Sequence, residues 1–286
     1  MPIHVRMQQC QTHLPALLKR YLPPVSPDMP LFSAMHYACL NGGKRLRPLL
    51  AYCSAEIFGA PWQIVDEIAV AIEFIHCYSL IHDDLPAMDN DDLRRGKPTC
   101  HKVYGDALAI LAGDALLTLA FDVLSSQSTN FIKVISQAAG AHGMVKGQAI
   151  DLSAQHKSLT LEQITQMHHA KTGRLIAASV QCGALATGHA TEDDLTELQK
   201  FGEAIGLSFQ IQDDILDTLG QTDVMGKHPG QDAKQEKCTF VSLLGLEKAR
   251  AHAHACHQKA LASLQRFDQR ADPLRALSAY IIERVA

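Results

Sequence analysis

The chain contains a long interval without proline. Six of its twelve prolines lie within the first thirty residues, and none lies between Pro98 and Pro229. Proline breaks or kinks helices, so this interval is free to form long ones. Within it, residues 161–180 and 191–219 place apolar side chains at three- and four-residue spacing, with few β-branched runs or hairpin dipeptides. The sequence therefore predicts an all-α fold.

Two threonines mark expected helix starts. Thr160 and Thr191 precede the two periodic segments, and acidic residues follow each threonine within the first turn. A threonine side chain accepts a hydrogen bond from the free amides there, and acidic residues favour the positive end of the helix dipole. We therefore expect helices to begin within a few residues of positions 160 and 191.

Length and composition indicate one globular domain. The chain has 286 residues, of which 47% are hydrophobic and 20% are charged, and no linker divides it, so we predict a single domain over residues 1–286. A net charge of −4 and a pI near 6.4 give no general attraction to nucleic acid or anionic membranes. We therefore predict no nucleic-acid partner, and any binding of an anionic ligand must be local.

Cysteine usage and the N-terminal segment favour a cytoplasmic protein. None of the eight cysteines lies in a C-x-x-C pair, so we interpret them as reduced thiols. The first residues lack both a basic segment followed by an apolar run and a small-residue cleavage site. The most apolar stretch, residues 104–124, contains Asp106, Asp114 and Asp122. We therefore predict a buried helix there and no membrane span.

Two acidic clusters follow apolar segments. They comprise Asp83, Asp84 and Asp89 in the first, and Asp213, Asp214 and Asp217 in the second. Adjacent carboxylates in apolar surroundings are unfavourable unless a cation compensates their charge. Either cluster alone would be equally compatible with a solvated helix end, but the pair favours metal binding.

Helical rotation brings the second cluster together. At about 100° per residue, Asp213 and Asp217 share one face, and Gln210 lies about one turn before Asp213. In the first cluster, Asp83 and Asp89 would point about 120° apart on an ideal helix. Because Pro86 disfavours helix, we expect a break that lets these two carboxylates converge.

The chemistry of the acidic clusters favours magnesium. Carboxylates without nearby cysteine suit Mg²⁺, which keeps several waters and shares its remaining ligands with phosphate oxygens. A calcium EF-hand is the competing interpretation for residues 89–92. That segment lacks the glycine and the distal glutamate which an EF-hand loop requires.

Basic residues accompany the acidic clusters in the sequence. The candidates for holding phosphate oxygens are the following lysines and arginines: Lys44, Arg45 and Arg47 after Gly43, then Arg94, Arg95, Lys97, Lys171, Arg174, Lys227 and Lys237. A surface ion pair is the alternative for each of them. His76 lies seven residues before Asp83, on the same helical face and about 10 Å further along the helix. We interpret it as a ligand contact, with a core histidine as the alternative.

The motifs together resemble a known family. In order they are GGKRLRP (42–48), HDDLPAMDNDDLRRGKPTCH (82–101), KTGRL (171–175) and FQIQDDILD (209–217). Over residues 34–246 the chain resembles the trans-prenyltransferases, or polyprenyl synthetases. The resemblance implies a helical bundle around a central cavity, the isoprenoid synthase fold, and a homodimer. It also implies a Mg²⁺-assisted, head-to-tail condensation of geranyl or dimethylallyl diphosphate with isopentenyl diphosphate, which gives farnesyl diphosphate and diphosphate.

The resemblance also implies residue roles. Isopentenyl diphosphate would contact Gly43, Lys44, Arg47, His76 and Arg95. Several Mg²⁺ ions would be bound by Asp83, Asp84, Asp89, Asp213, Asp214 and Asp217. The allylic diphosphate would contact Arg94, Lys171, Thr172, Gln210, Lys227 and Lys237. Of these residues, Asp83, Asp84, Asp213, Lys171, Thr172 and Gln210 would be catalytic.

Product length follows from the same resemblance. It places the residues that block the cavity at Tyr78 and Ser79, and an aromatic residue at the first position resembles enzymes of farnesyl length. The chain departs from the family at Asn90, where aspartate is frequent, and at Cys238, where serine is expected. A geranylgeranyl or longer-chain synthase, a class I terpene cyclase and a non-catalytic synthase subunit are the alternatives.

Overall fold

The computed structural model describes residues 1–155, 157–220 and 238–283, and it is helical as predicted. The α-helices are α1 (Ile3–Tyr21), α2 (Pro30–Leu40), α3 (Leu46–Ile57), α4 (Asp66–Asp83), α5 (Cys100–Tyr104), α6 (Asp106–Leu124), α7 (Thr129–Ala139), α8 (Met144–Ala154), α9 (Leu161–His168), α10 (Arg174–Leu185), α11 (Glu192–Thr218), α14 (Phe240–Leu244), α15 (Leu246–Ser263) and α16 (Asp272–Ile282). Shorter elements are η1 (Trp62–Ile64), η2 (His169–Gly173), η3 (Gln269–Ala271) and the strands β1 (Leu93–Arg94) and β2 (Lys97–Pro98). The two strands form an antiparallel pair that pairs Arg94 with Lys97.

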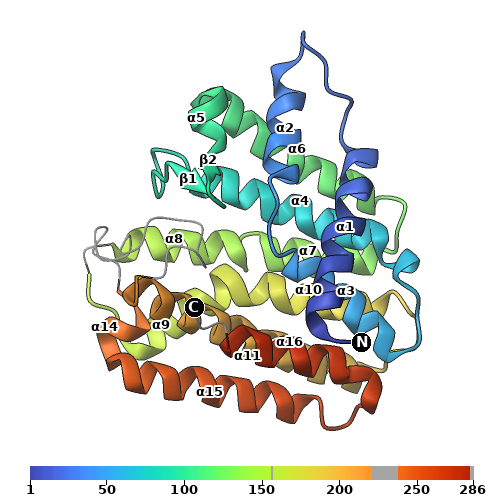
Figure 1. Cartoon of the computed structure of the whole chain (residues 1–286), viewed down its shortest axis with the longest axis vertical. Coiled ribbons are helices and arrows are strands. Elements are labelled where there is room, and N and C mark those ends of the chain that lie inside the picture. The colour runs from blue at the N-terminus through green and yellow to red at the C-terminus, as the bar shows by residue number, and fades with distance from the viewer. Residues whose placement is uncertain (156, 221–237, 284–286) are drawn as a thin grey trace.

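The helices form a bundle. Figure 1 shows α4 and α6 on one side of the molecule, α11, α15 and α16 on the other, and α8 and α10 between them. The most extensive packing joins α4 to α6, α11 to α15, and α10 to both α3 and α11. The main core contains Phe74 of α4, Leu49 of α3 and Phe201 of α11, all fully buried. Burial of such side chains is the main force that holds the bundle together.

Both expected helix starts are confirmed. Thr160 precedes α9 and Thr191 precedes α11, and each forms a reciprocal capping box with the residue three positions later. Residues 161–180 are not one regular helix, however. The π-helical turn η2 separates α9 from α10. Such turns widen a helix locally and are frequent at functional sites, and the apolar spacing gave no sign of this one.

The apolar segment 104–124 is only partly buried. Its main helix, α6, turns Ala109 and Leu116 inward, while Ile110 and Leu111 are 44% and 51% exposed. The prediction of a buried helix was therefore wrong for one face of α6. Among the described helices, α6 alone has the length and hydropathy to cross a bilayer. This is weak evidence for a span, since core helices of soluble proteins meet the same criteria.

Candidate active site

A cavity of about 920 Å³ brings the sequence motifs together. Most of the predicted site residues line it: Gly43, Lys44, Arg47, His76, Tyr78, Ser79, Asp83, Asp89, Arg94, Arg95, Lys171, Thr172, Gln210, Asp213, Asp214 and Asp217. Two further predicted residues, Lys227 and Lys237, lie outside the residues that the structure describes. The bundle therefore encloses a central cavity, as the resemblance implied.

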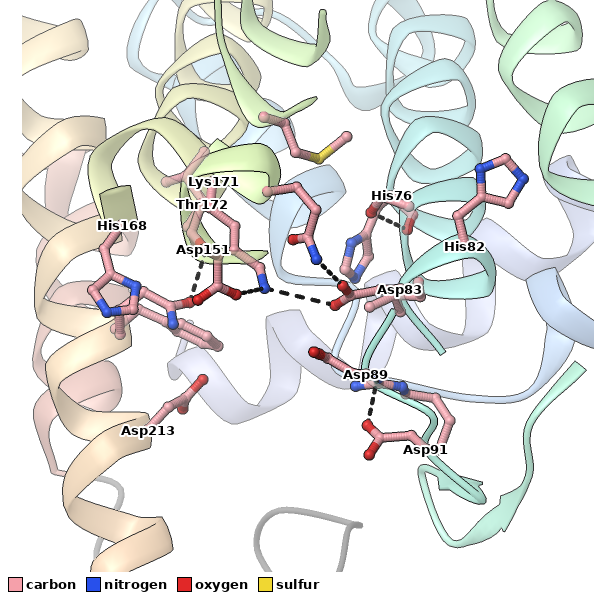
Figure 2. A pocket seen from close by; sticks show the side chains of 18 of the residues that line it. His76, His82, Asp83, Asp89, Asp91, Asp151, His168, Lys171, Thr172 and Asp213 are labelled. Carbon is pink, nitrogen blue, oxygen red and sulfur yellow. Dashed lines mark hydrogen bonds and ion pairs between the residues drawn. The ribbon is translucent and has the colours of Figure 1, made fainter. Parts of the chain in front are cut away.

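The first acidic motif begins where α4 ends. The helix stops at Asp83, and the turn that contains Pro86 returns the chain so that the Asp89 amide donates to the Asp83 carbonyl at 2.9 Å. This confirms the expected break between the two aspartates. Figure 2 shows the side chains of Asp83 and Asp89 facing the same space. Residue 90 has a φ of 52°, a left-handed conformation that asparagine tolerates well.

The second aspartate of this motif points elsewhere. Asp84 is 3% exposed, does not line the main cavity, and accepts a hydrogen bond from Arg94 Nε at 3.0 Å. The same guanidinium lies 3.2 Å from Asp91 Oδ2. Successive helical residues point about 100° apart, and here the rotation from Asp83 to Asp84 directs the second carboxylate to Arg94. In this structure the Asp84 carboxylate thus pairs with Arg94 outside the main cavity, and its role as a metal ligand stays a prediction.

Lys171 lies among carboxylates. Its Nζ is 2.7 Å from Asp151 Oδ2 and 3.8 Å from Asp83 Oδ2, and Gln148 Nε2 also donates to Asp83. Figure 2 shows this ammonium between the two aspartates. Burial alone would lower the pKa of Lys171, but the neighbouring carboxylates outweigh it and hold that pKa above its ordinary value. Lys171 is therefore a fixed cation at neutral pH.

The π-helical turn η2 presents Lys171 and Thr172 to the cavity. It packs closely on α8, where a Cβ at Gly147 would clash with the backbone of Lys171. Thr172 Oγ1 donates to Gln210 Oε1 at 2.8 Å, which links the turn to α11. The structure thus brings Lys171 and Thr172 of η2 close to Gln210 of α11, although the two elements are separate in the sequence.

The second acidic motif lies across the cavity on α11. Asp213 and Asp217 both line the cavity, as their shared helical face predicted. Figure 2 shows Asp213 on the wall opposite Asp89. Asp214 also lines the cavity, but its Oδ2 accepts the backbone amide of Phe240 at 2.7 Å. Asp214 therefore fixes the start of α14.

Three aromatic rings support that contact. The Phe240 ring is stacked between His168 of α9 and His252 of α15, with centroid separations of 5.6 Å and 5.7 Å. Phe240 is completely buried. The stacked rings thus fix the backbone at Phe240, next to Thr239, which lines the cavity.

The opposed carboxylates suit a metal shared with a ligand. In the described ranges, no three His, Cys, Asp or Glu side chains lie close enough to bind a metal by themselves. Instead, Asp83 and Asp89 lie on one wall and Asp213 lies on the other, with Asp217 about one turn further along α11. Mg²⁺ takes one or two carboxylates and completes its octahedron with water and phosphate oxygens. The donor set therefore fits Mg²⁺ bound together with a phosphorylated substrate.

A cationic group lies beside an earlier turn of α4, where Arg47 of α3 approaches His76. Arg47 Nη1 donates to His76 Nε2 at 3.4 Å. Burial lowers the pKa of His76 well below its ordinary value, and the charges of Arg47 and Arg95 lower it further. Burial likewise lowers the pKa of Arg47 to about 10. At neutral pH the imidazole is therefore neutral and the guanidinium is charged, so this end of the cavity attracts anions.

The GGKRLRP loop is held by contacts that the sequence did not reveal. Arg45 is buried with a φ of 51°, and its guanidinium donates to Glu73 Oε1 at 2.5 Å and to the Cys39 carbonyl at 2.6 Å. Glu73 was not predicted as a site residue, and Arg45 was predicted to hold phosphate oxygens, not a carboxylate of the protein. A non-glycine residue in this conformation persists only where surrounding contacts hold it.

Gly43 is required for a second contact of this loop. Its φ is +110°, which only glycine adopts readily, and a Cβ there would clash with the Arg95 guanidinium. Arg95 also donates from Nη1 to the Gly42 carbonyl. The loop before α3 and the turn between β1 and β2 are thereby joined, so that Lys44, Arg47 and Arg95 line one region of the cavity.

The last two turns of α4 form much of the cavity wall. Tyr78 is 6% exposed and lines the cavity, although ideal rotation separates it from Asp83 by about 140°. Ser79 also lines it and donates from Oγ to the His76 carbonyl at 2.8 Å. The cavity therefore surrounds α4 on several sides, which an argument from one helical face could not show.

Several polar residues of the cavity were missed from the sequence. Gln148 and Asp151 of α8 both line it, as do Asp91 and His168. The first two are three residues apart and so share one helical face. The three-residue spacing of Gln148 and Asp151, in an otherwise weakly polar segment, was the sequence pattern that could have indicated a polar helix face in the cavity. Asp91 and His168 carried no comparable local pattern.

Known proteins resemble this chain over nearly all of its length. Residues 29–279 match the family model described as polyprenyl synthetase. The farnesyl diphosphate synthase of Escherichia coli strain K12 is 44% identical over 292 residues, covering 98% of each chain. An apo crystal structure of an FPP/GFPP synthase from Zymomonas mobilis has a TM-score of 0.87 at 41% identity, covering 98% of each chain. A Helicobacter pylori geranyltransferase, crystallised with magnesium and isoprenyl diphosphate, has a TM-score of 0.84 at 36% identity, covering 98% of this chain and 96% of that one.

Proposed function

The chain belongs to the polyprenyl synthetase family, and we propose that it catalyses the farnesyl diphosphate synthase reaction. The substrates are geranyl or dimethylallyl diphosphate and isopentenyl diphosphate. The observation that carries the proposal is the pair of opposed carboxylate groups in one cavity, with Lys171 beside the first group and a separate arginine-rich region nearby. The carboxylate region suits a metal-bound diphosphate, and the arginine-rich region suits a diphosphate held by basic side chains alone.

The allylic diphosphate occupies the carboxylate end in this proposal. Bound Mg²⁺, held by Asp83, Asp89, Asp213 and Asp217, supplies charge stabilisation for the departing diphosphate. Lys171 donates to its oxygens, because its ammonium is fixed and charged. Such preorganised positive charge favours ionisation of the allylic carbon–oxygen bond.

Isopentenyl diphosphate occupies the arginine-rich end. Lys44, Arg47 and Arg95 hold its diphosphate, and the neutral His76 keeps Arg47 in place. Its double bond attacks the allylic cation, the new carbon–carbon bond forms, and a proton is lost to the released diphosphate. The buried apolar wall of the cavity excludes water, which would otherwise capture the cation.

Some of the remaining predicted residues contact the allylic substrate, and others hold neighbouring groups in place. Arg94, Thr172, Gln210, Lys227 and Lys237 contact the allylic diphosphate in this proposal. Asp84 and Asp214 act indirectly, because their carboxylates hold Arg94 and the Phe240 amide. We assign product length to Tyr78 and Ser79 at the wall of the cavity.

We further propose a homodimer of single-domain, cytoplasmic chains, each domain spanning residues 1–286. The neighbouring exposed side chains of Ile110 and Leu111 on α6 support the dimer, because an interface would remove these large apolar groups from water. All eight cysteines lie in described residues and are free, which is consistent with a reducing compartment.

A product assay tests the function. Purified protein is incubated with magnesium, geranyl diphosphate and labelled isopentenyl diphosphate, and the dephosphorylated alcohols are separated by size beside a chelator control. A chelator-sensitive fifteen-carbon alcohol is the expected result. Longer alcohols would support a geranylgeranyl or longer synthase, which the FPP/GFPP relative makes the main alternative. Diphosphate binding without product would indicate a non-catalytic subunit.

A further inference from the structure

His82 connects the first acidic motif to α6. It precedes Asp83 in the last turn of α4, and Figure 2 shows its ring directed away from that carboxylate. His82 Nε2 donates to the Ile110 carbonyl of α6 at 3.0 Å. A Cβ at Gly113 would clash with the His82 ring. The ring therefore fits against α6 because residue 113 has no side chain.

The same ring packs against Tyr78. These residues are four positions apart on α4, which places them on neighbouring turns of one face. Their rings meet edge to face, with centroids 5.8 Å apart and planes at 77°. Both side chains line the cavity, and Tyr78 is nearly buried. The position of the Tyr78 ring is thus set partly by His82, and that of His82 by the backbone of α6 and by Asp114, whose Oδ1 lies 3.8 Å from His82 Nε2.

We propose that His82, seated on Gly113, is a positioning residue that determines product length by holding the Tyr78 ring at the cavity wall. The inference rests on the proposed function. Without the imidazole, the tyrosine ring can rotate into the vacated space beside α6, because packing no longer fixes one side-chain rotamer. The cavity then deepens, and a further five-carbon unit can be added before the chain meets the wall.

Three substitutions at His82 separate ring packing from hydrogen bonding. His82→Ala removes both, His82→Gln keeps a donor without the ring, and His82→Phe keeps a ring without the donor. We expect the alanine and glutamine variants to raise the proportion of twenty-carbon product by about fivefold, the scale of one lost aromatic contact. The phenylalanine variant is expected to keep the fifteen-carbon product.

A double variant tests whether His82 acts through Tyr78. Tyr78→Ala alone is expected to lengthen the product. Adding His82→Ala to it is expected to cause no further lengthening, because residues that act through one another are not additive. His36→Ala is the matched control, since His36 also bonds one backbone carbonyl, that of Pro23 at 2.8 Å, but does not line the cavity. It should leave the product distribution unchanged.

The outcomes are distinguishable. Active His82→Ala and His82→Gln variants that make only the fifteen-carbon product, while Tyr78→Ala makes longer ones, would overturn this inference and leave the proposed function intact. Further lengthening in the double variant would also overturn it, by showing that His82 acts directly. A wild-type protein that makes no prenyl product at all would reject the proposed function itself. If His82→Ala does not fold, His82→Gln carries the same expectation.

Discussion

Arg45 and Glu73 form an ion pair that is almost completely shielded from water. Their side chains are 2% and 1% exposed, and Arg45 Nη1 lies 2.5 Å from Glu73 Oε1. The pair joins α4 to the loop that carries Lys44 and leads into α3, where Arg47 lies. It also holds Arg45 in a left-handed backbone conformation. The shape of the proposed isopentenyl diphosphate region therefore depends on a contact between residues 28 positions apart.

Glu73→Gln should destabilise the protein strongly. Removing one partner leaves the buried guanidinium without a counter-charge, which typically costs about 3–5 kcal/mol. The free energy of unfolding, measured with urea, gives the loss. Glu247→Gln is the matched control, because Glu247 forms an exposed pair with Arg250, and such pairs contribute about 1 kcal/mol or less. Equal losses in the two variants would contradict the prediction.

Asp151→Asn should impair catalysis without unfolding the chain. Asp151 is the nearest carboxylate to Lys171, and its loss lets the ammonium move from its place beside Asp83. We expect kcat/KM for the allylic substrate to fall by about 10- to 100-fold, the usual effect of removing a supporting contact. Asp28→Asn, on an exposed loop, should leave kcat/KM unchanged. A change of less than twofold in the first variant would contradict this role.

His76 should make the protein less stable in acid. The pKa of His76 is lowered in the folded state, first by burial and then by the charges of Arg47 and Arg95. At pH values between this lowered pKa and the ordinary histidine pKa of about 6.5, the imidazole binds a proton in the unfolded chain but not in the folded protein. Stability contributed by the neutral imidazole is therefore present above about pH 6.5 and falls below it, by up to about 1.4 kcal/mol per pH unit. Urea midpoints at pH 5 to 8 measure the slope.

His76→Gln gives the comparison for that slope. The acid loss of stability should be smaller in this variant than in the wild type, because glutamine does not titrate. His4→Gln, at an exposed position of α1, should keep the wild-type slope. An unchanged slope in His76→Gln would show that other groups cause the acid sensitivity.

Charged substitutions on α6 should dissociate the proposed dimer. Ile110→Asp combined with Leu111→Asp places two carboxylates on the exposed apolar face, where burial in an interface would strip them of water. Sedimentation at micromolar concentration should change from the dimer to the monomer of 31.2 kDa. Val25→Asp, at another exposed apolar position, is the control. A monomeric wild type would disprove the dimer itself.

Local patterns in the sequence were sufficient for several features. Thr160 and Thr191 cap helices as expected, and Asp213 and Asp217 share a face of α11. Pro86 separates Asp83 from Asp89 as its chemistry requires. Each of these predictions depends on residues within about two turns of one another, where backbone geometry fixes relative direction. The sequence by itself thus determined the helical class, the main helix starts and the two acidic motifs.

Only the tertiary structure decided which side chains meet. It turned Asp84 toward Arg94, tied Asp214 to Phe240, seated His82 on Gly113 and left one face of α6 exposed. These outcomes depend on the packing of helices that are distant in sequence, and local periodicity carries no information about which helices will be neighbours. The π-helical turn at Lys171 belongs with them, because the close approach of α8 at Gly147 accompanies it.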